Sequence, residues 1–413
     1  MPTITYHLEQ QMFDSIQEAV MLSKRIFPEK GPLADQDHLA LWEGISQMKH
    51  ALNRKLFQAE QLEEDPLEEC FTNGASLFQK CTFQSAFQFW STLVKSVLTY
   101  RCSLKTTQDI HFSTLIDRAK YVSYETLVEQ TKANIHNLPM DLQARLCIYY
   151  QSFPYMWGTM DLTKGCYEVV ENRIHAFKEH TEDFSWLYQH LEDYRSKAVL
   201  TAFLQYWTDY DPNELFKTRE PTFPDYFDLD LYHPDENEVF VDLGSFTGDT
   251  IQEYLRTFSS YGSFYCFEMS PDNMKTIQEN LKENKNIHYV SKAAGAEKGT
   301  MFVHMNEGVD SANTFARDDG EKTAVEVTTI DDEITEPVST IKMDIEGAEQ
   351  DALKGCVRHI KEDHPKLLIS VYHNNEDIWK IPRMIHELQP DYRFYLRNNG
   401  NQWGPSELVL LAI

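Results

Sequence analysis

The sequence predicts a chain in two parts, a helical region over residues 1–210 and an α/β domain over residues 238–413. Two observations predict the α/β domain and one predicts the helical region. From Glu238 onward, short apolar runs alternate with amphipathic segments, and residues 211–237 form a proline-containing boundary before them. Up to about residue 210, apolar residues instead recur at helical spacing. Alternation of strands and helices calls for a mostly parallel sheet with helices on both faces.

The composition narrows the class of protein. The chain has 413 residues, 42% of them hydrophobic, and 65 acidic against 38 basic side chains give a net charge of −27. This is a folded globular composition, and the acidity disfavours nucleic acid and anionic membranes as partners. No apolar run approaches the roughly 18 residues of a membrane span, and the first residues do not resemble a signal peptide. The seven cysteines show no metal or disulfide spacing, which indicates reduced thiols and a cytoplasmic location.

The helical region contains no motif with recognisable chemistry. Apolar spacing predicts helices at 41–56, 79–98, 112–135 and 184–198, the last capped by Asp183, with a break near 137–139 that would divide the region into two subdomains. We expect this region to serve in acceptor recognition or in homo-oligomer formation. Between residues 211 and 237, four prolines predict an extended, irregular linker, because proline fixes φ and lacks a backbone donor.

The elements of the α/β domain follow from the period of the apolar residues. The predicted helices are 250–258, 272–283, 349–362 and 377–388. The predicted strands are 239–243, 263–268, 286–291, 300–304, 324–329, 339–343, 366–372, 392–396 and 407–411. The last two strands are joined by a short loop containing glycine, which predicts a terminal hairpin and places one antiparallel strand at an edge of the sheet.

The most informative segment is the turn after the first strand of the domain, VFVDLGSFTGDT at 239–250. Gly244 and Gly248 lie where a strand meets a helix, so a ligand can approach the backbone and the free N–H groups of the helix. The dinucleotide fingerprint needs a glycine at Phe246, and Asp242 would repel a pyrophosphate. An acidic turn suits an ammonium group, such as the amino-acid end of S-adenosyl-L-methionine. The cofactor-binding residues expected in this turn are Asp242, Gly244, Ser245, Phe246, Gly248 and Thr250.

The next strand ends in Glu268, 20 residues after Gly248. A carboxylate at this place can accept hydrogen bonds from both hydroxyls of a ribose. We expect Met269 beside it, and the adenine near the end of the third strand, at Lys292 and Ala293. The alternative is that Glu268 only caps the following helix.

Two further strand ends carry polar side chains. The segment STIKMDIEGAE places Lys342, Asp344, Glu346 and Glu349 after one strand, and His373 follows the next. In an open α/β sheet the ligand crevice lies at the carboxyl ends of the strands, so these groups are expected beside the reactive methyl group. Asp344 is therefore expected both in the cofactor site and in catalysis.

The segments VFVDLGSFTGDT, FYCFEMSPDNMKTIQENL, VTTIDDEI, STIKMDIEGAEQDALKG and PKLLISVYHNNEDIWKIP together resemble the FkbM-type S-adenosylmethionine-dependent methyltransferases. The resemblance covers about residues 225–413, including a lead-in DYFD at 225–228, and does not extend to the first 200 residues. It implies a class I, Rossmann-like methyltransferase fold with a seven-stranded sheet. It also implies O-methylation of a hydroxyl, typically on a sugar, a glycan or a secondary metabolite.

Methyl transfer to an alcohol requires alignment of oxygen, methyl and sulfur and removal of the hydroxyl proton. The predicted catalytic residues are His373 and Asp344 for deprotonation and Lys342 for orienting the acceptor. A divalent metal held by Asp344 is an alternative, but no dedicated ligand spacing favours it. Residues Ser311, Asn313 and Thr314 lie in a polar segment that could reach over the site or form an ordinary surface loop.

Other classes of function compete with this one. An N-methyltransferase or a peptide or protein methyltransferase would use the helical region for acceptor recognition. A non-catalytic cofactor-binding assembly protein is disfavoured by the intact cluster of Lys342, Asp344 and Glu346. A nicotinamide dehydrogenase is disfavoured by Phe246.

Overall fold

The structure is a computed structural model that describes residues 106–303, 322–400 and 406–413. The helices predicted at 41–56 and 79–98, and the polar segment with Ser311, Asn313 and Thr314, lie outside the described residues. The chain divides into two compact units, Met1–Gln130 and Thr131–Ile413. The predicted boundaries at 210 and 238 therefore fall within the second unit and remain a prediction.

In the first unit the structure describes α5 (Thr107–Tyr121) and the start of α6 (Tyr124–Asn137). Thr106 and Asp109 form a capping box at the beginning of α5, which supplies partners for two backbone N–H groups. The helix predicted over 112–135 is thus two helices, separated where Ser123 accepts a hydrogen bond from the backbone N–H of Thr126. Arg118 donates to Gln130 Oε1 at 2.8 Å and links them.

The second unit begins with helices and a small hairpin. The helices are α7 (Met140–Ser152), α8 (Pro154–Trp157), α9 (Glu168–Glu179), α10 (Thr181–His190), α11 (Tyr194–Asp209) and α12 (Pro212–Phe216). The hairpin consists of β1 (Met160–Asp161) and β2 (Cys166–Tyr167), which periodicity did not predict. The single helix predicted across 184–198 is wrong: α10 ends at His190, and the Asp193 side chain caps α11 by accepting from Ser196 N.

The segment predicted as an extended linker contains one short helix. Pro212 occupies the first turn of α12 and Asp211 caps it, so the proline begins a helix here instead of preventing one. Further along, Phe227 and Tyr232 are fully buried in the core of the following sheet. This segment is part of the packed structure.

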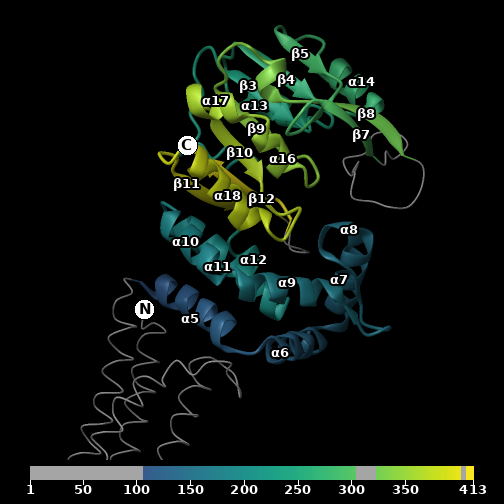
Figure 1. Ribbon diagram of the computed structural model, residues 1–413, viewed down its shortest axis with the longest axis vertical. Coiled ribbons are helices and arrows are strands. Elements are labelled where there is room, and N and C mark those ends of the chain that lie inside the picture. Colours follow the sequence, from purple (N-terminus) through teal and green to yellow (C-terminus); the bar gives the residue numbers. More distant parts are fainter. Residues whose placement is uncertain (1–105, 304–321, 401–405) are drawn as a thin grey trace, which may run out of the picture. The chain divides into compact units, whose positions relative to one another are not determined.

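The central sheet has seven strands in the order β11-β12-β10-β9-β3-β4-β5 (Figure 1). Their bounds are β3 (Val239–Leu243), β4 (Ser263–Phe267), β5 (Ile287–Val290), β9 (Thr340–Met343), β10 (Lys366–Ser370), β11 (Phe394–Asn398) and β12 (Leu408–Ala412). The predicted α/β fold with a mostly parallel seven-stranded sheet is confirmed. One detail differs: the antiparallel strand β12 lies between β10 and β11, so it is not at the edge.

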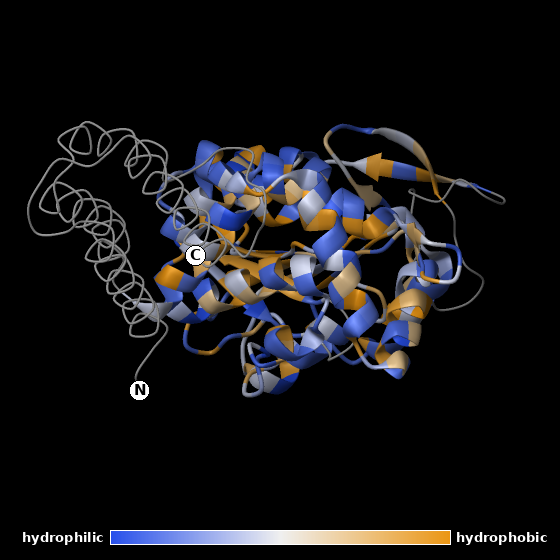
Figure 2. Ribbon diagram, turned by 90° about the horizontal axis from the view of Figure 1, so that it is seen from below, coloured by the Kyte–Doolittle hydropathy of each residue, from blue (hydrophilic) through white to orange (hydrophobic). Residues whose placement is uncertain are grey.

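Helices pack on both sides of this sheet, and apolar residues concentrate along its strands (Figure 2). The helices of the domain are α13 (Asp249–Thr257), α14 (Pro271–Asn280), α15 (Ile330–Glu333), α16 (Glu349–Lys354), α17 (Val357–Glu362) and α18 (Asp377–Leu388). The helix predicted over 349–362 is interrupted at Gly355, where a Cβ atom would lie 2.2 Å from the backbone oxygen of Gly295.

A second sheet of three strands lies beside the first, with order β6-β8-β7. Its strands are β6 (Ala293–Ala294), β7 (Gly299–Val303) and β8 (Thr323–Thr328). Across the described residues, no helix has both the length and the hydropathy that crossing a membrane requires.

Candidate active site

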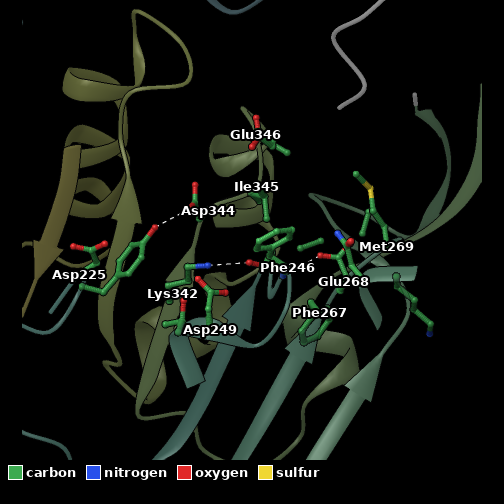
Figure 3. A pocket seen from close by; sticks show the side chains of 18 of the residues that line it. Asp225, Phe246, Asp249, Phe267, Glu268, Met269, Lys342, Asp344, Ile345 and Glu346 are labelled. Atoms are coloured by element: carbon green, nitrogen blue, oxygen red, sulfur yellow. Dashed lines mark hydrogen bonds between the residues drawn. The ribbon is translucent and has the colours of Figure 1, made fainter. Parts of the chain in front are cut away.

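A cavity of about 650 Å³ opens at the carboxyl ends of β3, β4 and β9. Figure 3 shows Asp225 and Asp344 on one side of Phe246, and Glu268 and Met269 on the other. Following the assignments that the sequence predicts, we call the side with Glu268 the cofactor end and the side with Asp344 the acceptor end. The predicted site residues that line the cavity are Gly244, Phe246, Thr250, Glu268, Met269, Lys292, Ala293, Lys342 and Asp344.

The turn between β3 and α13 is shaped by its two glycines. Gly244 and Gly248 both have φ of +77°, in the left-handed region that favours glycine. A Cβ atom on Gly244 would lie 2.0 Å from the backbone oxygen of Asp344, so this glycine allows the ends of β3 and β9 to approach. Ser245 and Gly248 lie in the turn but not along the cavity wall, and Ser245 Oγ donates to Asp242 O at 2.9 Å.

Glu268 is joined to that turn by one hydrogen bond and to its own following segment by another. Its two carboxylate oxygens accept from Phe246 N at 3.1 Å and from Ser270 N at 2.8 Å. The side chain is 8% exposed, and burial raises the pKa of its carboxyl. The Asn273 side chain bonds to this carboxylate as well, and because a carboxylate offers about four acceptor positions, capacity for a further hydrogen bond remains. Glu268 is therefore positioned like a group that binds a pair of hydroxyls.

Lys292 and Ala293 line the cofactor end beyond Met269. The ammonium group of Lys292 lies 3.1 Å from carboxylate oxygens of both Glu326 and Glu333. Its charge is therefore already balanced within the protein, and its stem is the part available to a ligand.

Asp242 and Lys342 form a buried ion pair beneath the glycine turn. Lys342 Nζ lies 3.1 Å from Asp242 Oδ1 and donates to Gly244 O at 2.9 Å. Burial raises the pKa of Asp242 to about 6, although Lys342 opposes this shift. Asp242 is fully buried and is absent from the cavity lining. The structure thus places these two residues where they brace the turn.

Asp344 lies at the acceptor end and is held by a residue that sequence reasoning did not assign. The Tyr226 hydroxyl donates to Asp344 Oδ2 at 2.7 Å and lies 3.1 Å from Ser370 Oγ. Tyr226 precedes the predicted domain by 12 residues and has φ of +69°, rare for a residue with a side chain. The lead-in DYFD was the signal that could have identified it.

Additional carboxylates line the cavity with Asp344, namely those of Asp225, Glu346 and Glu407, and Asp249 lines it at the start of α13. Burial raises the pKa of Glu346 to about 7. Burial and the nearby charge of Asp344 raise the pKa of Glu407 to about 7 as well. The acceptor end is thus strongly acidic.

His373 lies behind Asp344 and not along the cavity wall. The ring is 1% exposed, with Nδ1 2.9 Å from Glu349 Oε1 and Nε2 3.5 Å from Asp344 Oδ1. Burial would lower its pKa, but the carboxylates of Glu349 and Asp344 raise it to about 10. With these contacts alone the ring is protonated at neutral pH. The role of general base that the sequence suggested for His373 does not fit this geometry.

The strand order and the cavity at the carboxyl ends define a class I methyltransferase fold. Residues 242–402 match the family model described as Methyltransferase FkbM domain. The resemblance of the C-terminal half to this family is therefore confirmed over residues 242–402. No curated protein matches the chain.

Among solved structures, the methyltransferase FkbM from Methylobacillus flagellatus is 22% identical, with a TM-score of 0.50. The match covers 71% of this chain and 78% of that one, so the shared fold extends beyond residues 242–402 into the helical region. An rRNA methylase from Streptococcus thermophilus is 12% identical, with a TM-score of 0.30 and coverage of 43% and 87%. Aeropyrum pernix fibrillarin, solved with natively bound S-adenosyl-L-methionine, is 12% identical, with a TM-score of 0.29 and coverage of 44% and 67%.

Proposed function

We propose that this chain transfers the methyl group of S-adenosyl-L-methionine to a hydroxyl of a small molecule, namely a sugar, a glycan or a secondary metabolite. The observation that carries the cofactor assignment is the position of Glu268 at the end of β4. It lines the cavity, is bonded to the glycine turn through Phe246 N, and keeps acceptor capacity for a ribose.

The cofactor would span the cavity from the glycine turn to Ala293. Gly244, Phe246 and Thr250 would contact its amino-acid moiety, and Met269, Lys292 and Ala293 its adenine. Asp242 pairs with Lys342, so we assign it to holding the turn and not to direct contact. Asp249 lines the cavity at the start of α13 and is the carboxylate we assign to the ammonium group.

The acceptor would lie beside Asp344, the group that we assign to activation of its hydroxyl. Asp344 lines the cavity, and its orientation is fixed by the hydrogen bond from Tyr226. In-line transfer requires the hydroxyl oxygen, the methyl carbon and the sulfur to be aligned, and residues of both ends line one cavity. Lys342 supports this arrangement from below through Gly244 O.

The charge of the acceptor end limits the acceptor. Asp225, Asp344, Glu346 and Glu407 all line it, and Lys342 is already paired. An anionic acceptor would be repelled, so neutral polyols and molecules with an amino group are favoured. The same carboxylates support N-methylation of a cationic acceptor as the second candidate function.

Calorimetric titration with S-adenosyl-L-methionine tests the cofactor assignment. We expect saturable binding that is lost in Glu268→Ala and weakened at least tenfold in Glu268→Gln. Glu279→Gln is the matched control, because Glu279 is an exposed residue of α14 outside the cavity lining. A wild-type protein that does not bind this cofactor would refute the proposal. Labelled cofactor with a panel of sugars and amino sugars would then identify the acceptor.

A further inference from the structure

We propose that Asp344 and His373, supported by Glu349, form a binding site for one divalent transition-metal ion at the acceptor end. Its use in methyl transfer rests on the proposed function above, whereas ion binding itself does not. The ligand atoms of these three residues all lie within 4.8 Å of one another.

The distance between the two ligands supports this site. His373 Nε2 and Asp344 Oδ1 are 3.5 Å apart, longer than a normal hydrogen bond. Nε2 has no hydrogen-bond partner among the described residues, although His373 is only 1% exposed. Two ligands about 2.0–2.2 Å from a shared ion at a tetrahedral angle are about 3.3–3.6 Å apart. The observed separation fits two ligands of one ion.

Both ligands are oriented by groups on their other sides. Glu349 Oε1 lies 2.9 Å from His373 Nδ1 and also accepts from Ile345 N at 2.9 Å. A carboxylate on the second nitrogen of a histidine ligand is the usual arrangement in metal sites, because it fixes the ring and its tautomer. Tyr226 occupies Asp344 Oδ2, which leaves Oδ1 facing Nε2.

The charges of the cluster also call for a cation. Asp344, Glu346, Glu349 and Glu407 interact electrostatically with one imidazole. Glu349 is fully buried, and its Oε2 has no hydrogen-bond partner within the described part of the chain. Buried carboxylates without enough cations are costly, and a divalent ion would offset that cost. A mixed set of imidazole and carboxylate suits Mn²⁺, Fe²⁺ or Zn²⁺ better than Mg²⁺.

An ion held by one imidazole and one carboxylate retains open positions. A hydroxyl bound there would be acidified, so the ion would supply the activation that His373 cannot give as a base. Asp344 would then act as a ligand, and His373 would act through the ion.

Titration of the full, EDTA-treated chain with Mn²⁺ tests the site, with free Mn²⁺ followed by electron paramagnetic resonance. We expect one bound ion per chain, with affinity at least tenfold weaker in Asp344→Asn and in His373→Gln. Asp351→Asn is the matched control, because Asp351 is an exposed carboxylate on α16 that pairs with Lys354. Thermal unfolding of each variant shows whether it remains folded.

Pulsed electron paramagnetic resonance provides a second readout, which identifies the type of ligand directly. Bound Mn²⁺ should show coupling to an imidazole nitrogen in the wild type, and this coupling should disappear in His373→Gln. Failure to bind Mn²⁺ stoichiometrically, or binding without nitrogen coupling, would overturn the site. Titration with S-adenosyl-L-methionine in EDTA separates the two proposals. A chain that binds the cofactor but no ion refutes only the metal site. A chain that binds the ion but no cofactor refutes only the cofactor assignment.

Discussion

The two ends of the cavity are built in different ways. The cofactor end is drawn mostly from one continuous stretch, since Gly244, Phe246, Thr250 and Glu268 lie within 25 residues of sequence. The acceptor end combines residues from distant segments, and Tyr226 and Asp344 are separated by 118 positions. The first end depends on local backbone geometry, and the second depends on the packing of the whole unit.

This difference matters for how each end responds to change. The turn at the cofactor end is fixed by backbone hydrogen bonds and positive φ values, which only a few residue types can satisfy. The acceptor end is fixed by contacts between side chains, which can be changed one at a time. The following predictions use this contrast, from the largest expected effect to the smallest.

Gly244→Ala should have the largest effect, because it affects both ends. Gly244 has φ of +77°, which disfavours a side chain, and an added Cβ atom would lie 2.0 Å from the backbone oxygen of Asp344. We expect a loss of more than about 3 kcal/mol of unfolding free energy, measured by urea denaturation. Gly299→Ala is the control, since a Cβ atom there meets nothing within 4 Å. Equal losses of unfolding free energy in the two variants would show that the ends of β3 and β9 do not pack closely at Gly244.

The buried pair beneath the turn should produce a pH dependence of stability. The pKa of Asp242 is raised from 3.8 to about 6, so the folded state binds this proton more tightly than the unfolded state. The stability that this group contributes is complete below about pH 4 and is lost as the pH rises through 6. The expected loss is about 2–3 kcal/mol.

Comparison of wild type with Asp242→Asn isolates this effect from that of other carboxylates. The difference between their unfolding free energies, measured by urea denaturation from pH 4 to 7.5, should fall with rising pH. A constant difference would mean that Asp242 has an ordinary pKa. The absolute stability of the variant is not the readout, because Lys342 loses its partner.

Tyr226→Phe should affect only the acceptor end. It removes the hydrogen bond to Asp344, and a bond to a charged group contributes about 1.5–3 kcal/mol. We expect methyl transfer to fall about 10- to 100-fold while calorimetry shows unchanged cofactor affinity. Tyr261→Phe is the control, because its hydroxyl donates to Lys285 O away from the cavity. Weakened cofactor binding in Tyr226→Phe would show that the two ends are not separable.

Lys292→Gln should have the smallest effect, although the sequence placed this residue in the cofactor site. Its ammonium group pairs with Glu326 and Glu333 at a partly exposed position, and such pairs contribute little. We expect cofactor affinity to change less than about threefold by calorimetry. A tenfold loss would instead indicate that the ammonium group contacts the cofactor.

The cofactor end was largely predictable from the sequence. The strand 239–243, the glycines after it and the acid ending the next strand are local patterns, and β3 has the predicted bounds. Asp242 is an exception. Its place at the end of the strand is visible in the sequence, but its ion pair with Lys342 exists because β9 is the neighbouring strand in the sheet, which no local pattern predicts.

The acceptor end was predictable only in part. Strand ends placed Asp344 and His373 near one another, and the structure does bring them together. Tyr226 lies in the lead-in DYFD, which carries no hint of a contact with Asp344, and Glu407 lies in a segment with no recognisable motif. Tertiary packing brings both residues to the cavity. The protonation of His373 likewise follows from the approach of Glu349, a contact that no local sequence pattern predicts.

The placement of β12 has a practical consequence for anyone who dissects this protein. The family match ends at residue 402, yet β12 (Leu408–Ala412) lies inside the sheet, hydrogen-bonded to β10 and β11. On the other flank, Trp157 Nε1 donates to Tyr372 O, next to His373. A fragment cut at the limits of the match would lose β12, the first three residues of β3 and this support. Expression trials should therefore retain the helices before the domain and the final strand.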